Sequence, residues 1–204
     1  LSSVVPSVTL VSFSTMNRNM QNAYSEQGSF EVERQLGANS TLSAGYEHLR
    51  GLHLILSVNR NAPTCVASGS NNGCRPNPAY ANNSQYSSLA DSHYDGLHVS
   101  FVQRPARWGS YRISYTYSKA LDNVGEFFFS SPINNFNIWQ DYGRSDDDQR
   151  HRVVFDGSVH SPSAHANTLR QRLFYGFQLS GMLQYYSPLP FNITAGSNTV
   201  QGTA

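Results

Sequence analysis

The chain has 204 residues, of which 39% are hydrophobic and only 13% are charged, and its formal net charge is +1. This length suits one domain and is too short for a large multidomain enzyme. The low net charge and the 12 Tyr, 11 Phe and 2 Trp exclude wholesale disorder, and the scattered arginines offer no basic patch for nucleic acid. Because Lys and Glu are scarce beside Ser, Asn, Gly and Tyr, the composition favours an all-β protein.

Hydropathy alternates with a period of two residues, which predicts strands with one apolar and one polar face. The expected strands are residues 7–14, 29–36, 40–49, 94–104, 110–119, 150–160 and 173–187. They predict an antiparallel up-and-down meander of about seven long strands in a single domain, residues 1–204. No stretch approaches the roughly 18 apolar residues of a membrane-spanning helix.

Two cysteines, Cys65 and Cys74, lie in the Gly/Asn/Ser-rich segment 62–78. The flexible chain between them makes a short disulfide sterically easy, which indicates an oxidising compartment. The alternative is two free thiols in a cytosolic loop, although free cysteine usually prefers burial. No third and fourth ligand stand at zinc spacing, so no metal site is predicted.

The predicted connections alternate between short and long. Tight turns are expected at residues 36–40 and 104–109, long loops at about 59–84 and 120–149, and a medium link at 161–172. Short and long connections then fall on opposite ends of the sheet, as the periplasmic turns and outer loops of a transmembrane β-barrel do. A water-soluble sheet with cross-strand aromatic pairs is the alternative interpretation.

In a barrel, the alternation assigns each side chain to lipid or to the lumen. The lipid-facing set is Tyr111, Ile113, Tyr115, Phe155, Phe177, Leu179 and Leu183, and the lumen-facing set is Arg112, Thr116, Asp156, Gln178 and Gln184. Seven strands would start at the periplasmic side and end outside. Both long loops would emerge from the same end, so we expect them to touch.

The second long loop contains six aromatic residues, Phe127, Phe128, Phe129, Phe136, Trp139 and Tyr142. They either pack on one another and on the neighbouring loop, or form a surface for a sugar, a peptide or a partner chain. Further along, Asp146, Asp147 and Asp148 lack the Gly and distal Glu of a helix–loop Ca²⁺ site. A solvated turn paired with arginines 144, 150 or 152 is expected there.

Catalytic patterns are lacking in the sequence. Ser, His and Asp all occur, but no Gly-x-Ser-x-Gly elbow is present and the seven histidines are scattered. We therefore expect a protein that is not an enzyme and that uses no cofactor.

Two local sequence patterns point to a family. The pattern SYTYSKALDN at residues 114–123, and DYGRSDDDQRHRVV at 141–154, closely resemble barrel strands of TonB-dependent receptors of the Oar-like group. Shorter matches are RPNP at 75–78, YDGLHVS at 94–100 and QLSGML at 178–183. The likeness runs in order from about residue 21 to 194. It implies a 22-stranded outer-membrane barrel with an internal plug, which imports a scarce, bulky nutrient with force passed from the inner membrane by TonB.

The chain departs from that family in extent. About seven strands are expected where a bacterial barrel needs at least about eight, and no plug, TonB-contacting segment or terminal aromatic strand is found. Because the chain starts at Leu1 without a signal-peptide pattern, we expect a fragment or a processed form.

Three hypotheses follow. The first is a barrel segment of a receptor in the bacterial outer membrane, whose partners are lipid and the remaining strands and plug. The second is an extracellular structural or adhesive protein that assembles with copies of itself through strand edges or a donated segment, residues 1–14. The third is a soluble, glycan-binding sandwich. The strand patterns do not identify the cargo, because specificity lies in loops and plug.

Overall fold

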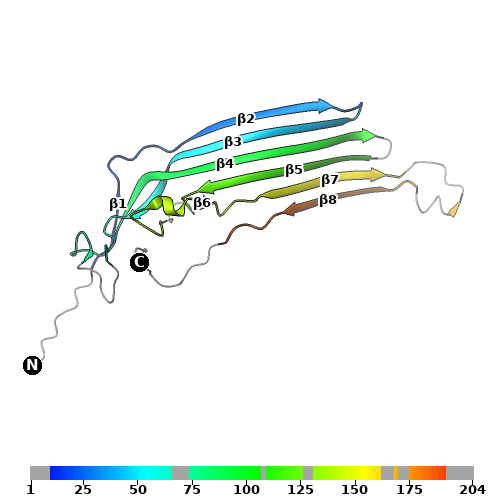
Figure 1. Cartoon of the computed structure of the whole chain (residues 1–204). Coiled ribbons are helices and arrows are strands. Elements are labelled where there is room, and N and C mark those ends of the chain that lie inside the picture. Colours follow the sequence, from blue (N-terminus) through cyan, green and yellow to red (C-terminus); the bar gives the residue numbers. More distant parts are fainter. Residues whose placement is uncertain are drawn as a thin grey trace, which may run out of the picture.

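The computed structural model describes residues 10–65, 74–106, 109–125, 131–161, 168–169 and 175–191. They form one curved sheet of eight strands (Figure 1). The elements are β1 (Phe13–Met16), β2 (Tyr24–Gln35), β3 (Ser40–Asn59), β4 (Asn83–Ala106), β5 (Gly109–Asp122), the 3₁₀ turn η2 (Ile138–Asp141), β6 (Gly143–Arg144), β7 (His151–His160) and β8 (Gln178–Tyr186). None of the helices in the described chain is long and apolar enough to cross a membrane.

The six long strands follow one another across the sheet in the order β2-β3-β4-β5-β7-β8, each antiparallel to the next. The predicted all-β antiparallel meander is therefore confirmed. Two short strands, β1 and β6, complete the eight, and β6 pairs only with the end of β5, at Leu121 and Asp122. The short turns after β2 and β4 lie at one end, and the long connections after β3 and β5 lie at the other (Figure 1).

The predicted first strand, 7–14, is placed differently in the structure. Residues 1–9 lie outside the described residues, and the described strand, β1, begins at Phe13. It runs parallel to β4 beside residues 83–86, at the long-loop end. The meander thus contains six strands, an even number, so it starts at Tyr24 and ends at Tyr186 on the same end. The expectation that its two ends lie on opposite sides is wrong.

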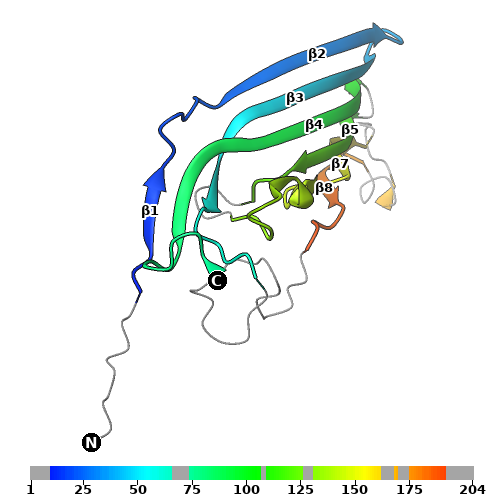
Figure 2. The same ribbon diagram turned by 60° about the vertical axis from the view of Figure 1, so that its left-hand side comes forward.

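β3 and β4 are much longer than predicted, with 20 and 24 residues. Both bend sharply towards the long-loop end (Figure 2), and their register shifts twice, at Gly51/Leu54 and at Leu54/Ile55. His53 adopts a left-handed conformation at this bulge, with φ of 58°. A bulge interrupts the period of two, because it adds unpaired residues to one strand. The alternation therefore stops near Leu49 although the strand continues.

The only buried apolar cluster among the described residues lies beyond this bulge. Leu56, Val58 and Ala90 are buried there, and Leu54, Val124 and Ile138 pack against them. Elsewhere, large apolar side chains remain exposed on one face of the sheet, with 69% of Phe30 and 76% of Leu179 accessible. Such a face needs another apolar medium to cover it.

Candidate functional site: the two faces of the sheet

Strand register gathers the apolar residues on one face. Ile113 on β5 lies opposite Phe155 on β7, which in turn lies opposite Leu183 on β8. Tyr111, Tyr115 and Leu179 occupy the same face, as do Leu42 and Tyr46 on β3 and Leu97 and Phe101 on β4. Phe177 immediately precedes β8 and is exposed. Directly opposite residues share a face, so the predicted apolar set is continuous across the sheet.

The other face is polar. Arg112 lies opposite Asp156, Thr116 opposite Arg152, Gln178 opposite His160 and Gln184 opposite Val154. The five residues predicted to face a lumen are therefore on one side. Arg152 and Tyr186 on the same face also interact, because the guanidinium of Arg152 lies 5.2 Å from the ring centre of Tyr186. The Tyr186 hydroxyl donates a 2.6 Å hydrogen bond to Gln184 Oε1.

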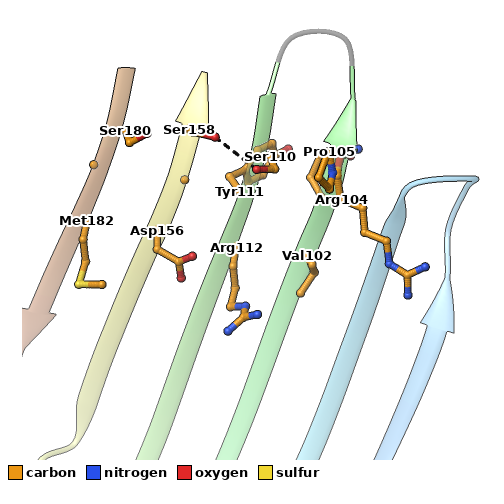
Figure 3. Close-up of a pocket in the computed structure, with 13 residues that line it drawn as sticks. Val102, Arg104, Pro105, Ser110, Tyr111, Arg112, Asp156, Ser158, Ser180 and Met182 are labelled. Atoms are coloured by element: carbon orange, nitrogen blue, oxygen red, sulfur yellow. Dashed lines mark hydrogen bonds between the residues drawn. The ribbon is translucent and has the colours of Figure 1, made fainter. Parts of the chain in front are cut away.

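The polar face is hollowed near the short-turn end, where a cavity of about 650 Å³ opens (Figure 3). Its lining includes Val102 and Arg104 of β4, Ser110 and Arg112 of β5, Asp156 and Ser158 of β7, and Ser180 and Met182 of β8. All eight alternate onto the polar face, which is therefore the concave one. Ser110 and Ser158 hydroxyl groups are 3.4 Å apart.

Two charges in this hollow face each other across neighbouring strands. Arg112 and Asp156 are register partners, and both project from the polar face in Figure 3. Over the described part of the chain, neither side chain forms an ion pair. The hollow can therefore offer a cation and an anion to a further protein segment or to a polar solute.

The second long loop contacts the last residue of β3, which is where the expected first long loop, about 59–84, begins. Asn59 N–H donates a 2.7 Å hydrogen bond to Asn135 Oδ1. The first loop is fixed by Asn61, whose amide donates to three carbonyl oxygens, those of Asn77, Tyr80 and Ala81, at 2.7–3.1 Å. Within the same loop, Arg75 Nη1 donates to the carbonyl oxygens of Asn61 and Ala81 and to Asn82 Oδ1.

The predicted disulfide between Cys65 and Cys74 is present, with a Cα–Cα distance of 5.7 Å. The backbone supports it, because Thr64 N–H donates a 3.0 Å hydrogen bond to the carbonyl of Cys74. The disulfide therefore closes a small covalent ring within the first long loop.

Half of the predicted aromatic set, Phe127, Phe128 and Phe129, lies outside the described residues. Phe136 is exposed. The rings of Trp139 and Tyr142 are 5.9 Å apart, and both line a cavity of about 410 Å³ together with His48, Arg50, Asp91, Ser92 and His93. The second long loop thus places two of its aromatic rings against residues of β3 and β4.

Asp148 differs from the expectation of a solvated turn. Its side chain is fully buried, and its Oδ2 accepts hydrogen bonds from Nε of both Arg144 and Arg150, each at 2.7 Å. Ala120 N–H donates to Oδ1 at 2.8 Å. Burial by itself would raise the pKa of Asp148, but the Ala120 amide and the two guanidinium groups outweigh it and lower the pKa. Of the expected arginine partners, Arg144 and Arg150 are correct. The expected solvent exposure is wrong for Asp148 and correct for Asp146 and Asp147.

Comparisons with known proteins agree with this geometry. A family model described as "Outer membrane beta barrel domain" matches residues 2–204. Among solved structures, the outer membrane transporter YddB from Escherichia coli matches with a TM-score of 0.51 and 11% sequence identity. That match covers 87% of this chain and 27% of the transporter, so the chain spans about a quarter of that protein's length. No curated protein matches the sequence.

Proposed function

Because the chain belongs to the outer membrane β-barrel domain family and so resides in the outer membrane, we propose that it forms part of the wall of a TonB-dependent transporter for a bulky nutrient. The observation that supports this proposal most strongly is the two-faced sheet. One face is apolar and exposed, as a wall facing lipid requires, and the opposite, concave face is polar and hollowed. In this proposal the chain contributes to transport rather than to catalysis.

The partners follow from the surfaces of the sheet. Lipid covers the apolar face. Within the described residues, the outer edges of β2 and β8 pair with no other strand, and the remaining strands of the barrel continue the hydrogen-bonded sheet there. The plug or the nutrient contacts the hollow around Arg112 and Asp156. The long-loop end, with its disulfide, lies outside the cell, and the short-turn end lies in the periplasm.

Nutrient-limited growth tests the transport function. Cells that produce the protein should outgrow cells that lack it on at least one nutrient from a panel of oligosaccharides and peptides too bulky for porins, and the advantage should vanish without TonB. Replacing both charges of the hollow, Arg112→Gln with Asp156→Asn, should reduce the advantage, because the plug or nutrient loses its charged contacts.

Lys119→Gln is the matched control, since Lys119 lies on the other face of β5, opposite Asp95. A growth advantage that persists without TonB would contradict the proposal. So would equal growth of the double variant and the Lys119 control at equal amounts of protein in the outer membrane.

A further inference from the structure

A cluster of two histidines and one aspartate lies on the apolar side of the β3–β4 pair. His48 on β3 is directly opposite Asp95 on β4, and His93 is two residues from Asp95 on the same strand. Residues two apart on a strand share a face, as do directly opposite residues. The register therefore brings all three side chains together, although His48 and Asp95 are 47 positions apart in the sequence.

The three groups are close enough to share one ion. His48 Nδ1 is 2.9 Å from Asp95 Oδ1, and His93 Nε2 is 2.8 Å from Asp95 Oδ2. All three ligand atoms lie within 4.8 Å of one another. Tetrahedral ligands about 2.0–2.1 Å from a zinc ion are roughly 3.3 Å apart. Binding would therefore move each imidazole slightly away from the carboxylate, and the two imidazole nitrogens, which lie within 4.8 Å of each other, towards the same ion.

The surroundings orient the carboxylate and leave the cluster accessible. Hydrogen bonds from His48 and from the Tyr46 hydroxyl hold the Asp95 carboxylate in place. About a third of each of the three side chains is exposed. The 410 Å³ cavity beside His48 and His93 leaves room for water or another ligand at an open coordination position.

The cluster stands just beyond the apolar band of the sheet. On the same face, the next residues towards the short turns are Tyr46 and Leu97, after which the face is apolar. In the other direction it becomes polar, with Glu26 opposite Arg50 and Lys119 opposite Asp95. An ion here is therefore reached from water. The positive charges of Arg50 and Lys119 weaken the binding of a metal cation. The negative charges of Asp95 and Glu26 counteract this effect.

We propose that His48, His93 and Asp95 bind one divalent transition-metal ion of the zinc class, which joins β3 to β4 on the outward face of the wall. Two imidazoles and one carboxylate suit zinc, copper, nickel or iron, whereas Mg²⁺ and Ca²⁺ prefer oxygen ligands only. The site lies on the face opposite the hollow, so it does not depend on the transport function.

Zinc titration of the full chain tests the site. The protein, without a histidine tag, is stripped with EDTA in detergent and titrated with Zn²⁺ alone against a chromogenic zinc chelator. We expect one equivalent of saturable binding that is lost in His93→Gln and in Asp95→Asn. His98→Gln is the matched control, because His98 lies on the polar face of β4, opposite Gly45, and should retain the full equivalent.

Two results would overturn the proposal: no saturable equivalent in the unchanged protein, or equal loss in His98→Gln. If the ligand variants fail to fold, histidine modification by diethylpyrocarbonate in the unchanged protein gives the answer. Zn²⁺ should protect His48 and His93, as measured by mass spectrometry of their peptides, while His98 is modified at the same rate with and without zinc. Unprotected His48 and His93 would refute the site.

Discussion

The buried carboxylate of Asp148 joins three parts of the long-loop end. It accepts a backbone hydrogen bond from Ala120 near the end of β5 and pairs with Arg144 of β6 and with Arg150, which precedes β7. A buried charge is stable only when it is paired and hydrogen-bonded, and all three bonds meet that need. Asp148 thereby fixes where the chain re-enters the sheet after its second long loop.

We expect Asp148→Asn to lower the free energy of unfolding by about 1 to 3 kcal/mol. This is less than the cost of breaking a fully buried pair, because both arginine side chains reach solvent. Denaturant unfolding in detergent, followed by tryptophan fluorescence, measures the change. Asp147→Asn is the control, since Asp147 is exposed, and should change the free energy by less than about 0.5 kcal/mol.

The same substitution should abolish one pH dependence. The pKa of Asp148 is lower in the folded than in the unfolded protein, so its contribution is complete above the unfolded pKa of about 3.9 and is lost as the pH falls through the folded pKa. The difference in stability between the unchanged protein and Asp148→Asn should therefore shrink only below about pH 4. A difference that shrinks between pH 8 and pH 6 would contradict this assignment.

At the scale of elements, the start of β5 requires a glycine. Gly109 has a φ of +142°, and a Cβ atom there would lie 2.2 Å from the carbonyl oxygen of Ser158 on β7. An L side chain is strained at this φ, and the atom it would meet is backbone that cannot rotate away. The start of β5 can thus pair closely with β7 only because residue 109 lacks a side chain.

Gly109→Ala should therefore destabilise the protein by about 2 kcal/mol or more in denaturant unfolding. Gly181→Ala is the matched control. Gly181 lies in β8, and a Cβ added there meets nothing within 4 Å, so the added methyl group should change stability little. Equal effects of the two substitutions would show that the close approach of β5 and β7 is not required.

β1 and the segment that follows it contact β4 at the long-loop end of the β3–β4 hairpin. β1 lies along the edge of β4 that β3 does not occupy, and Asn17 N–H donates a 2.9 Å hydrogen bond to the carbonyl of Tyr86. Gln21 then contacts the Ser88 hydroxyl through two hydrogen bonds before the chain enters β2. These hydrogen bonds hold the segment before β2 against the long-loop end of the β3–β4 hairpin.

At the scale of the whole molecule, the described sheet has one apolar and one polar face, as a barrel wall between lipid and water requires. Ile113 and Phe155 are register partners on the apolar face, and their sequence neighbours Arg112 and Asp156 are partners on the polar face. Adjacent residues of one strand thus separate two environments. This arrangement permits a test in which a shift of one residue decides the outcome.

Single cysteines at these positions should label differently in intact outer membranes. Arg112→Cys and Asp156→Cys should react with a charged, water-soluble maleimide, because the proposed barrel places the polar face in an aqueous lumen. Ile113→Cys and Phe155→Cys should stay unlabelled until the membrane is dissolved in denaturing detergent. The native Cys65 and Cys74 are bonded to each other and do not interfere. Equal labelling of Arg112→Cys and Ile113→Cys would exclude a lipid-facing wall.

The sequence by itself determined the six long strands of the meander and the face of each side chain, from Arg112 and Ile113 to Leu183. Side chains alternate along any extended strand, so a local pattern is sufficient to assign them. Only the tertiary structure decided the parallel position of β1, the bulge at His53, the burial of Asp148 and the grouping of His48 with Asp95. Each of these depends on register between segments far apart in the chain, and that register leaves no local period in the sequence.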